Sequence, residues 1–201
     1  MSTRQWLAAV GVVAACGMAP AGLSGAEPAN GVSPAAIDSF IVPIAEITPR
    51  MENTAVQNAP APSPPPAKGG PTPGDPCYFD ALRPDAAELF GTGVQAFRDV
   101  NYSGVSNIFV NQAIAVYPDA AAATAVVGRL TDGLSACRAS GGVTIANLSP
   151  AGASWAGSAC ADEARAVRNV AIRVQACHMD APAGVVSTVA DAISAKVNSA
   201  A

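Results

Sequence analysis

The most reactive side chains in this sequence belong to five cysteines and a single histidine. A zinc site needs closely spaced ligands, but no CxxC pair is present and only His178 could supplement the cysteines. His178 could act as a general base only beside a nucleophile and an orienting carboxylate. Asp180 is close in sequence, but no serine is marked as a nucleophile. We therefore expect a surface histidine, no catalytic residue, no metal site and no cofactor.

Cys16 ends a segment with the pattern of a secretory signal peptide. A positive charge at Arg4 precedes ten uncharged residues, 6–15, which are too short to cross a bilayer at ~1.5 Å per residue. Residues 13–16 resemble a bacterial lipobox, in which the cysteine is acylated and becomes the new N-terminus. The alternative is ordinary signal cleavage that discards Cys16. We expect residues 1–15 to be a lipoprotein signal peptide and Cys16 to be the lipidation site, so that the mature chain lies on the outer face of the cytoplasmic membrane.

Export makes disulfides the expected use of the other four cysteines, which allow three pairings. Strand-like runs flank residues 168–169, and a tight turn there sets Cys160 opposite Cys177. The two cysteines then form a non-hydrogen-bonded pair, with Cα atoms about 4.5 Å apart, close enough for a disulfide. This leaves Cys77 to pair with Cys137. Each bridge contributes about 3–4 kcal/mol in the chain-entropy model.

Polar residues interrupt the apolar strands expected between Arg98 and Tyr117. A binding cleft needs a few convergent polar groups against apolar walls, and this stretch supplies them. The alternative is that these residues are the solvated faces and ends of strands. Arg98 is the strongest candidate, because a guanidinium can hold an anionic or hydroxylated ligand. The predicted ligand-binding residues are Arg98, Tyr102, Asn111 and Gln112.

The elements that must position these residues are short of large apolar side chains. Of the 201 residues 50% are hydrophobic, but 45 are alanine and only 5% are aromatic. The net charge of −4 argues against nucleic acid as a partner, because binding it requires clustered cations. Signal, tether and loop take up much of the length, which leaves room for one domain.

A pass along the chain divides it into a tether, a proline-rich loop and a folded part. Residues 16–33 are rich in Gly, Ala and Pro and are typical of a flexible tether. Eight of the 17 prolines fall between Pro60 and Pro76, which predicts an extended internal loop over residues 51–75. The apolar spacing predicts helices at 34–47 (kinked by Pro43), 120–140 and 184–200, and strands at 94–100, 105–117, 143–146, 164–167 and 170–176.

Eight segments follow one another in an order typical of a known family: 38–41, 76–82, 95–98, 116–120, 134–137, 158–160, 168–177 and 192–197. Together they resemble the PknH-like extracellular sensor domain. This family forms the outer part of a mycobacterial receptor Ser/Thr kinase and also occurs in free-standing lipoproteins. The resemblance covers roughly residues 34–201 and implies an α+β fold, with an antiparallel sheet flanked by helices, two disulfides and a cleft proposed to bind a ligand.

The expected function is therefore that of a membrane-anchored lipoprotein with a single, non-catalytic, ligand-binding or sensor-like domain. The expected ligand is a small molecule, lipid, glycan or peptide of unknown identity, and the membrane is the other partner, through the lipid anchor. Two alternatives stay open: a cell-envelope hydrolase, and a structural or protein-interaction module that uses the proline-rich loop. An enzyme would have a deep pocket with converging titratable groups, whereas an interaction module would have a flat apolar patch.

Overall fold

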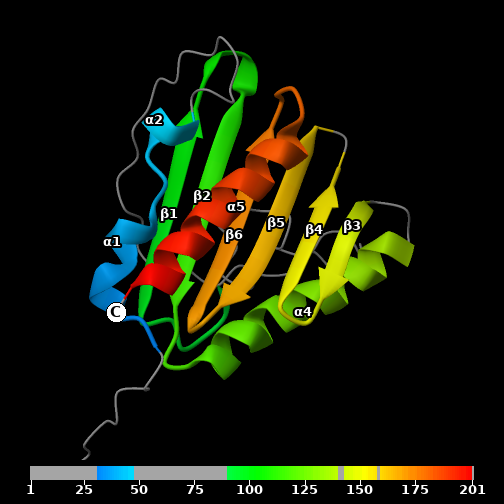
Figure 1. Cartoon of the computed structure of the whole chain (residues 1–201). Helices are drawn as coiled ribbons and strands as arrows, with labels where there is room; N and C mark the ends of the chain where they lie inside the picture. Colours follow the sequence, from blue (N-terminus) through cyan, green and yellow to red (C-terminus); the bar gives the residue numbers. More distant parts are fainter. Residues whose placement is uncertain (1–30, 48–89, 140–142, 158, 201) are drawn as a thin grey trace, which may run out of the picture.

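The structure, a computed structural model, describes residues 31–47, 90–139, 143–157 and 159–200. These residues form one six-stranded antiparallel sheet with strand order β1-β2-β6-β5-β4-β3 and helices on both sides (Figure 1). The fold is α+β. The N-terminal helical turns are η1 (Pro34–Ala36), α1 (Ile37–Phe40) and α2 (Ile44–Ile47). The remaining elements are β1 (Ala96–Ser103), η4 (Val105–Asn107), β2 (Phe109–Val116), α4 (Ala120–Ala139), β3 (Thr144–Ser149), β4 (Gly152–Ala156), β5 (Cys160–Val167), β6 (Val170–Cys177) and α5 (Pro182–Ser199).

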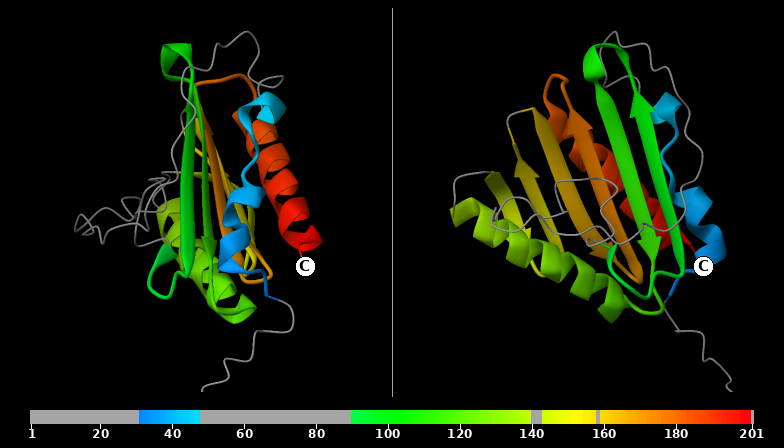
Figure 2. Two further views of the ribbon diagram at one scale, coloured as in Figure 1. Left: turned by 90° about the vertical axis from the view of Figure 1, so that its left-hand side faces the viewer. Right: turned by 180° about the vertical axis from the view of Figure 1, so that it is seen from behind.

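The helices and the sheet form three layers, with the sheet in the middle. Helix α5 and the N-terminal segment 31–47 cover one side, here the α5 face, and α4 crosses the other, the α4 face (Figure 2). Because side chains alternate along a strand, each strand contributes to both faces. β6 is buried along its whole length.

The core on the α5 face is built from β-branched and aromatic side chains. Val174 and Ile172 of β6 pack with Val189 and Ile193 of α5, which confirms the predicted amphipathic C-terminal helix. The N-terminal segment completes this core, and the side chain of Phe40 is fully buried there. The predicted kink in this segment is a break between α1 and α2 at residues 41–43, as expected where proline removes a backbone donor.

The core on the α4 face uses some of the many alanines of the chain. Alanines at matched positions of β2, β4, β5 and β6 pack with Val126, Leu130 and Leu134 of α4. Small side chains allow the helix axis to lie close to the sheet, so that the core is filled without many large residues. The alanines of this floor are Ala113, Ala115, Ala153, Ala164 and Ala171.

The hairpin of β5 and β6 has the predicted register. Cys160 lies opposite Cys177, with 4.1 Å between their Cα atoms, and the two form a disulfide. At the tight turn Arg168 has a φ of 53°, which is uncommon for this residue type. Its guanidinium donates hydrogen bonds to the carbonyls of Val197 and Ala200, so that the turn is fastened to the end of α5.

The structure corrects some predicted strand ends, and other predictions concern residues outside the described ranges. β1 and β3 extend past their predicted ends, and β4 was not predicted, because its five residues are mostly small. Cys137 is buried near the end of α4, but its predicted partner Cys77 lies outside the described residues, so that only the first of the two predicted disulfides is confirmed. The signal peptide, Cys16 and the proline-rich loop 51–75 also lie outside the described residues.

Candidate functional site

A row of polar side chains crosses the α4 face beyond the alanine floor. Five strands each contribute one residue, and each residue lies directly opposite the next in the register. Directly opposed residues share a face of the sheet, so the five side chains lie next to one another. We call these residues the polar row: Asn101 on β1, Asn111 on β2, Gln175 on β6, Asp162 on β5 and Trp155 on β4.

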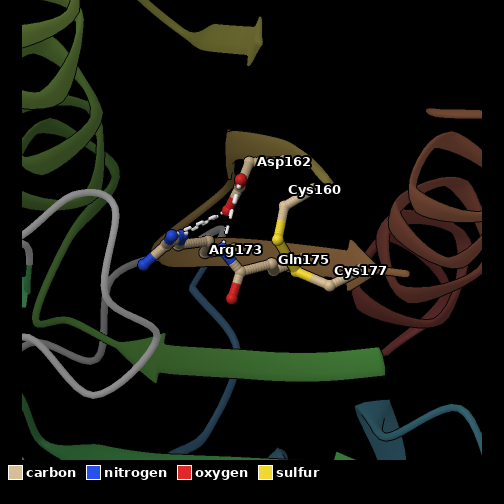
Figure 3. The surroundings of a disulfide bond; sticks show 5 residues. All are labelled: Cys160, Asp162, Arg173, Gln175 and Cys177. Carbon is tan, nitrogen blue, oxygen red and sulfur yellow. Dashed lines mark hydrogen bonds and ion pairs between the residues drawn. A yellow bond between two sulfur atoms is a disulfide. The ribbon is translucent and has the colours of Figure 1, made fainter. Parts of the chain in front are cut away.

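A buried ion pair lies at the centre of the polar row. Asp162 Oδ1 accepts hydrogen bonds from Arg173 Nη2 (2.7 Å) and Nε (3.2 Å), and Asp162 Oδ2 accepts one from Gln175 Nε2 (3.2 Å) (Figure 3). Asp162 is 3% exposed and Arg173 is fully buried. Arg173 lies opposite Ala164, whose small side chain leaves room for the guanidinium to reach Asp162 diagonally. The guanidinium also lies 5.7 Å from the centre of the Trp155 ring.

The environment of Asp162 acts on its pKa in two directions. Burial raises the pKa of this carboxyl above its ordinary value, while the charge of Arg173 and the hydrogen bonds from Arg173 and Gln175 act to lower it. Arg173 Nη2, 2.7 Å from Asp162 Oδ1, supplies the counter-charge to the carboxylate. The ion pair therefore leaves the centre of the row without net charge.

Within the described residues, two buried polar atoms of the row have no hydrogen-bond partner: Asn111 Oδ1 and Trp155 Nε1. Asn111 is 1% and Trp155 2% exposed. The orientation of the Asn111 amide is set by Asp99, because the carboxylate only accepts and Asn111 Nδ2 donates to it. Oδ1 is therefore left as an unused acceptor, and Trp155 Nε1 is an unused donor.

A surface pocket adjoins the end of the row on β1. It has a volume of about 330 Å³ and shares Asn101 with the polar row. His178, which follows the disulfide, is exposed at this pocket. Ser103 also lines the pocket, but within the described chain no hydrogen bond joins its hydroxyl to His178. The lining residues are Asn101, Ser103, Gly104, Asn107, Ile108, Phe109 and His178.

The four predicted ligand-binding residues do not lie together. Asn111 belongs to the polar row, but the other three point to the α5 face, where they contact the N-terminal segment. Arg98 binds the carboxylate of Asp38 (2.5 and 3.1 Å), and Gln112 binds the backbone of Val42 (2.9 and 2.8 Å). Burial raises the pKa of the third, Tyr102, against the effect of a backbone hydrogen bond from Ile44.

Four residues at the centre of the site were missed by sequence reasoning: Asp162, Arg173, Gln175 and Trp155. The signal was available in the predicted hairpin. The register that places Cys160 opposite Cys177 also places Asp162 opposite Gln175, on the same face as the disulfide. Glu163, the next residue along β5, instead accepts a hydrogen bond from Arg165 Nε.

Two further kinds of feature are absent from the described ranges. No group of three or more His, Cys, Asp or Glu residues that could hold a metal ion is found there. In the same part of the chain, no helix is long and apolar enough to cross a membrane.

The comparison with known families agrees with the fold and with the position of the N-terminal segment. A family model described as the PknH-like extracellular domain matches residues 32–196. The chain belongs to this family. The resemblance inferred from the sequence is therefore confirmed. The PknH-like match begins at Val32, which is buried against the sheet, so the segment covering the α5 face is part of the domain.

A solved structure of the same family has the same fold. The crystal structure of the extracellular domain of PknH from Mycobacterium tuberculosis superposes with a TM-score of 0.68 and 22% sequence identity. The match covers 84% of this chain and 97% of that chain. At this level of identity the likeness establishes the fold alone. A search of curated proteins found no match.

Proposed function

We propose that this protein is an exported, membrane-anchored lipoprotein with a non-catalytic, ligand-binding, sensor-like domain. Membership of a family of extracellular domains supports a location outside the cytoplasmic membrane. The signal-like residues 1–15, followed by Cys16, support export and lipidation. The acyl chains of the modified cysteine then hold the domain at the outer face of the membrane.

Ligand binding is supported above all by the two unpartnered atoms of the polar row. A buried polar group without a partner destabilises a fold by about 1–3 kcal/mol. Asn111 Oδ1 and Trp155 Nε1 both carry this penalty, while the ion pair between them is fully bonded. A ligand that bonds to both atoms removes the penalty, and the binding site is therefore the polar row with its adjoining pocket.

A binding role also suits the chemistry of this site. Asn111 is the sequence-predicted residue that stays in it, whereas Arg98, Tyr102 and Gln112 serve to attach the N-terminal segment. Asp162 and Arg173 neutralise each other and are buried, so neither is free to exchange protons with a substrate. Such a site orients and retains a ligand without acting as acid or base.

The test is a thermal-shift screen of the full chain carrying Cys16→Ser, against envelope lipids, glycans and peptides. A ligand that binds the folded state raises the midpoint of unfolding. We expect this shift in the parent and its loss in Asn111→Leu, with Asn147→Ala on the exposed strand β3 as the control. A screen without any shift, or a shift that Asn111→Leu retains, would contradict the proposed site.

Anchoring is tested separately by cell fractionation. The wild-type protein is expected in the membrane fraction, and Cys16→Ser is expected to leave it. If the variant stays with the membrane, acylation of Cys16 is not the anchor.

A further inference from the structure

The two edge strands of the sheet differ in how they are protected. On one edge, β1 carries the charged residues Arg98 and Asp99, and Arg98 pairs with Asp38 of the N-terminal segment, which runs beside the strand (Figure 1). Charges and a covering segment are common protection of an edge against pairing with another chain. On the other edge, β3 pairs with β4 on one side, and residues 144–149 contain no charge and no proline. Within the described residues, β3 therefore lacks the protection that β1 has.

A bulge in β3 brings two apolar side chains to the same face of the sheet. Ile145 lies opposite Trp155 and Leu148 lies opposite Ala153, while Ala146 has no opposed residue in β4. Both opposed residues of β4 belong to the core on the α4 face. Ile145 and Leu148 therefore both belong to the α4 face, although they are three positions apart and would point to opposite faces of a regular strand.

The bulge also makes β3 symmetric in polarity. Counted outward from residues 146–147, each side has an apolar residue and then a hydroxyl residue: Ile145 and Thr144 on one side, Leu148 and Ser149 on the other. Antiparallel pairing of two copies about a two-fold axis at the bulge therefore sets Ile145 opposite the partner's Leu148, and Thr144 opposite the partner's Ser149. Among the described residues, Leu148 is the large apolar side chain that is exposed, at 37%, and this pairing covers it.

Helix α4 extends the surface that two copies would share. Its C-terminal end projects past β3 (Figure 1 and Figure 2). A two-fold axis perpendicular to the sheet keeps the α4 faces of both copies on one side, so the two helix ends come to lie antiparallel and alongside each other. Asp132 and Arg138 are exposed at this end and carry opposite charges. Asp132 can therefore pair with the partner's Arg138, which makes the surface complementary to itself in charge.

From these observations we infer that β3 pairs with β3 of a second copy of this chain, so that two six-stranded sheets join across a two-fold axis. An extended segment of another protein is the alternative occupant, but the symmetry of β3 and the charges of α4 match a second copy. The inference goes beyond the proposed function, because it requires no ligand. Two short strands make a small interface, so we expect a weak dimer in solution. Confinement by the proposed lipid anchor raises the effective concentration of the copies.

The experiment is sedimentation velocity of the full chain carrying Cys16→Ser, over a range of concentrations. We expect a monomer–dimer equilibrium with a dissociation constant below about 1 mM. Leu148→Lys sets a cation against the partner's Ile145 twice in each dimer and is expected to weaken association at least about tenfold, or 1.4 kcal/mol. Asn198→Lys, which adds the same charge at an exposed position of α5, is the control. Hydrogen exchange should slow with concentration in residues 144–149 and not in 96–103.

A charge exchange at the exposed residue Ala146 tests the two-fold axis and does not depend on the folding of Leu148→Lys. Ala146→Lys and Ala146→Asp each place two like charges beside the axis, and each alone is expected to weaken the dimer. An equal mixture should associate more tightly than either variant alone, because the two copies then carry opposite charges. A parent chain that stays monomeric at about 1 mM overturns the inference, as does a dimer that Leu148→Lys retains. A mixture no tighter than its components overturns the pairing at the bulge.

Discussion

Gln112 binds both polar groups of the Val42 backbone: its Oε1 accepts from the Val42 N–H at 2.9 Å, and its Nε2 donates to the Val42 carbonyl at 2.8 Å. The side chain amide thus reproduces the pair of hydrogen bonds that a neighbouring strand would make. Asn169 binds the backbone of Val32 in the same way: its Oδ1 accepts from the Val32 N–H (2.7 Å), and its Nδ2 donates to the Val32 carbonyl (3.1 Å). Two amide side chains, Gln112 on β2 and Asn169 in the β5–β6 turn, therefore hold the N-terminal segment on the α5 face.

Replacing Gln112 by Leu is expected to loosen this segment. The substitution keeps an apolar stem but leaves the buried N–H and carbonyl of Val42 without partners, at about 1–3 kcal/mol for each group. Urea unfolding measures the loss of stability, and hydrogen exchange should show faster exchange in residues 31–47. The matched control is Gln95→Leu at an exposed position before β1, where we expect little change. Equal effects of the two substitutions would show that the amide of Gln112 does not hold Val42.

Removing Arg173 is expected to be far more destabilising than removing the arginine of a partly exposed ion pair. Arg173→Met leaves Asp162 buried without its counter-ion, which costs about 3–5 kcal/mol. Arg98→Met breaks the pair with Asp38, whose side chain is 60% exposed, and is expected to cost at most about 1 kcal/mol. Denaturant unfolding of both variants makes the comparison. Similar losses would contradict the assignment of Asp162 and Arg173 as a buried pair.

The same variant should show a characteristic dependence on pH. Burial already raises the pKa of Asp162, and loss of Arg173 raises it further. When the pKa of a carboxyl is higher in the folded than in the unfolded state, the protein loses stability as pH rises, because the carboxyl ionises first in the unfolded state. Arg173→Met should therefore be destabilised less at pH 5 than at pH 8. The double variant Asp162→Leu with Arg173→Met should lose this dependence and recover part of the stability.

The disulfides allow two further measurements. The bridge between Cys160 and Cys177 joins residues that are 17 positions apart in the sequence. Replacing both cysteines by Ser removes this constraint on the unfolded chain and is expected to lower the free energy of unfolding by about 3 kcal/mol. Peptide mapping without reduction should recover this bridge and a second peptide pair that joins Cys77 to Cys137. Detection of Cys77 as a free thiol would contradict the second pairing.

How far the sequence predicts this structure depends on the range of the contacts involved. The β5–β6 hairpin was predictable with its register, because a two-residue turn and two opposed cysteines are local constraints. Strand alternation also shows that Asn111 and Gln112, as neighbours in β2, must point to opposite faces, so the four predicted ligand residues could not line one surface.

The N-terminal segment could not be placed from sequence. Its attachment depends on Gln112 and Asn169, which are 70 and 137 residues away from Val42 and Val32 along the chain. Nothing local to the segment indicates these partners. The unused hydrogen-bonding atoms of Asn111 and Trp155 were equally hidden, because they become evident only once all neighbouring side chains are placed.

Tyr117 provides a prediction at alkaline pH. It is buried at the end of β2, its hydroxyl donates to the carbonyl of Phe90, and burial raises its pKa above the ordinary value against a weaker opposing effect of the Arg129 charge. The phenol ionises near pH 10 in the unfolded chain and only at higher pH in the folded protein. Above pH 10 the unfolded state therefore binds fewer protons, and the stability contributed by this group falls as pH rises.

Tyr117→Phe should consequently be less stable than the wild type at pH 8, by about 1 kcal/mol for the lost hydrogen bond. The difference should shrink, or change sign, at pH 11, because phenylalanine does not ionise in the unfolded state. Urea unfolding of both proteins at the two pH values measures this change. The absorbance difference between wild type and Tyr117→Phe near the phenolate band should show no ionisation of Tyr117 until the wild type unfolds. A constant difference between pH 8 and pH 11 would mean that Tyr117 ionises as readily in the folded protein as in the unfolded chain, which its burial and its bond to Phe90 oppose.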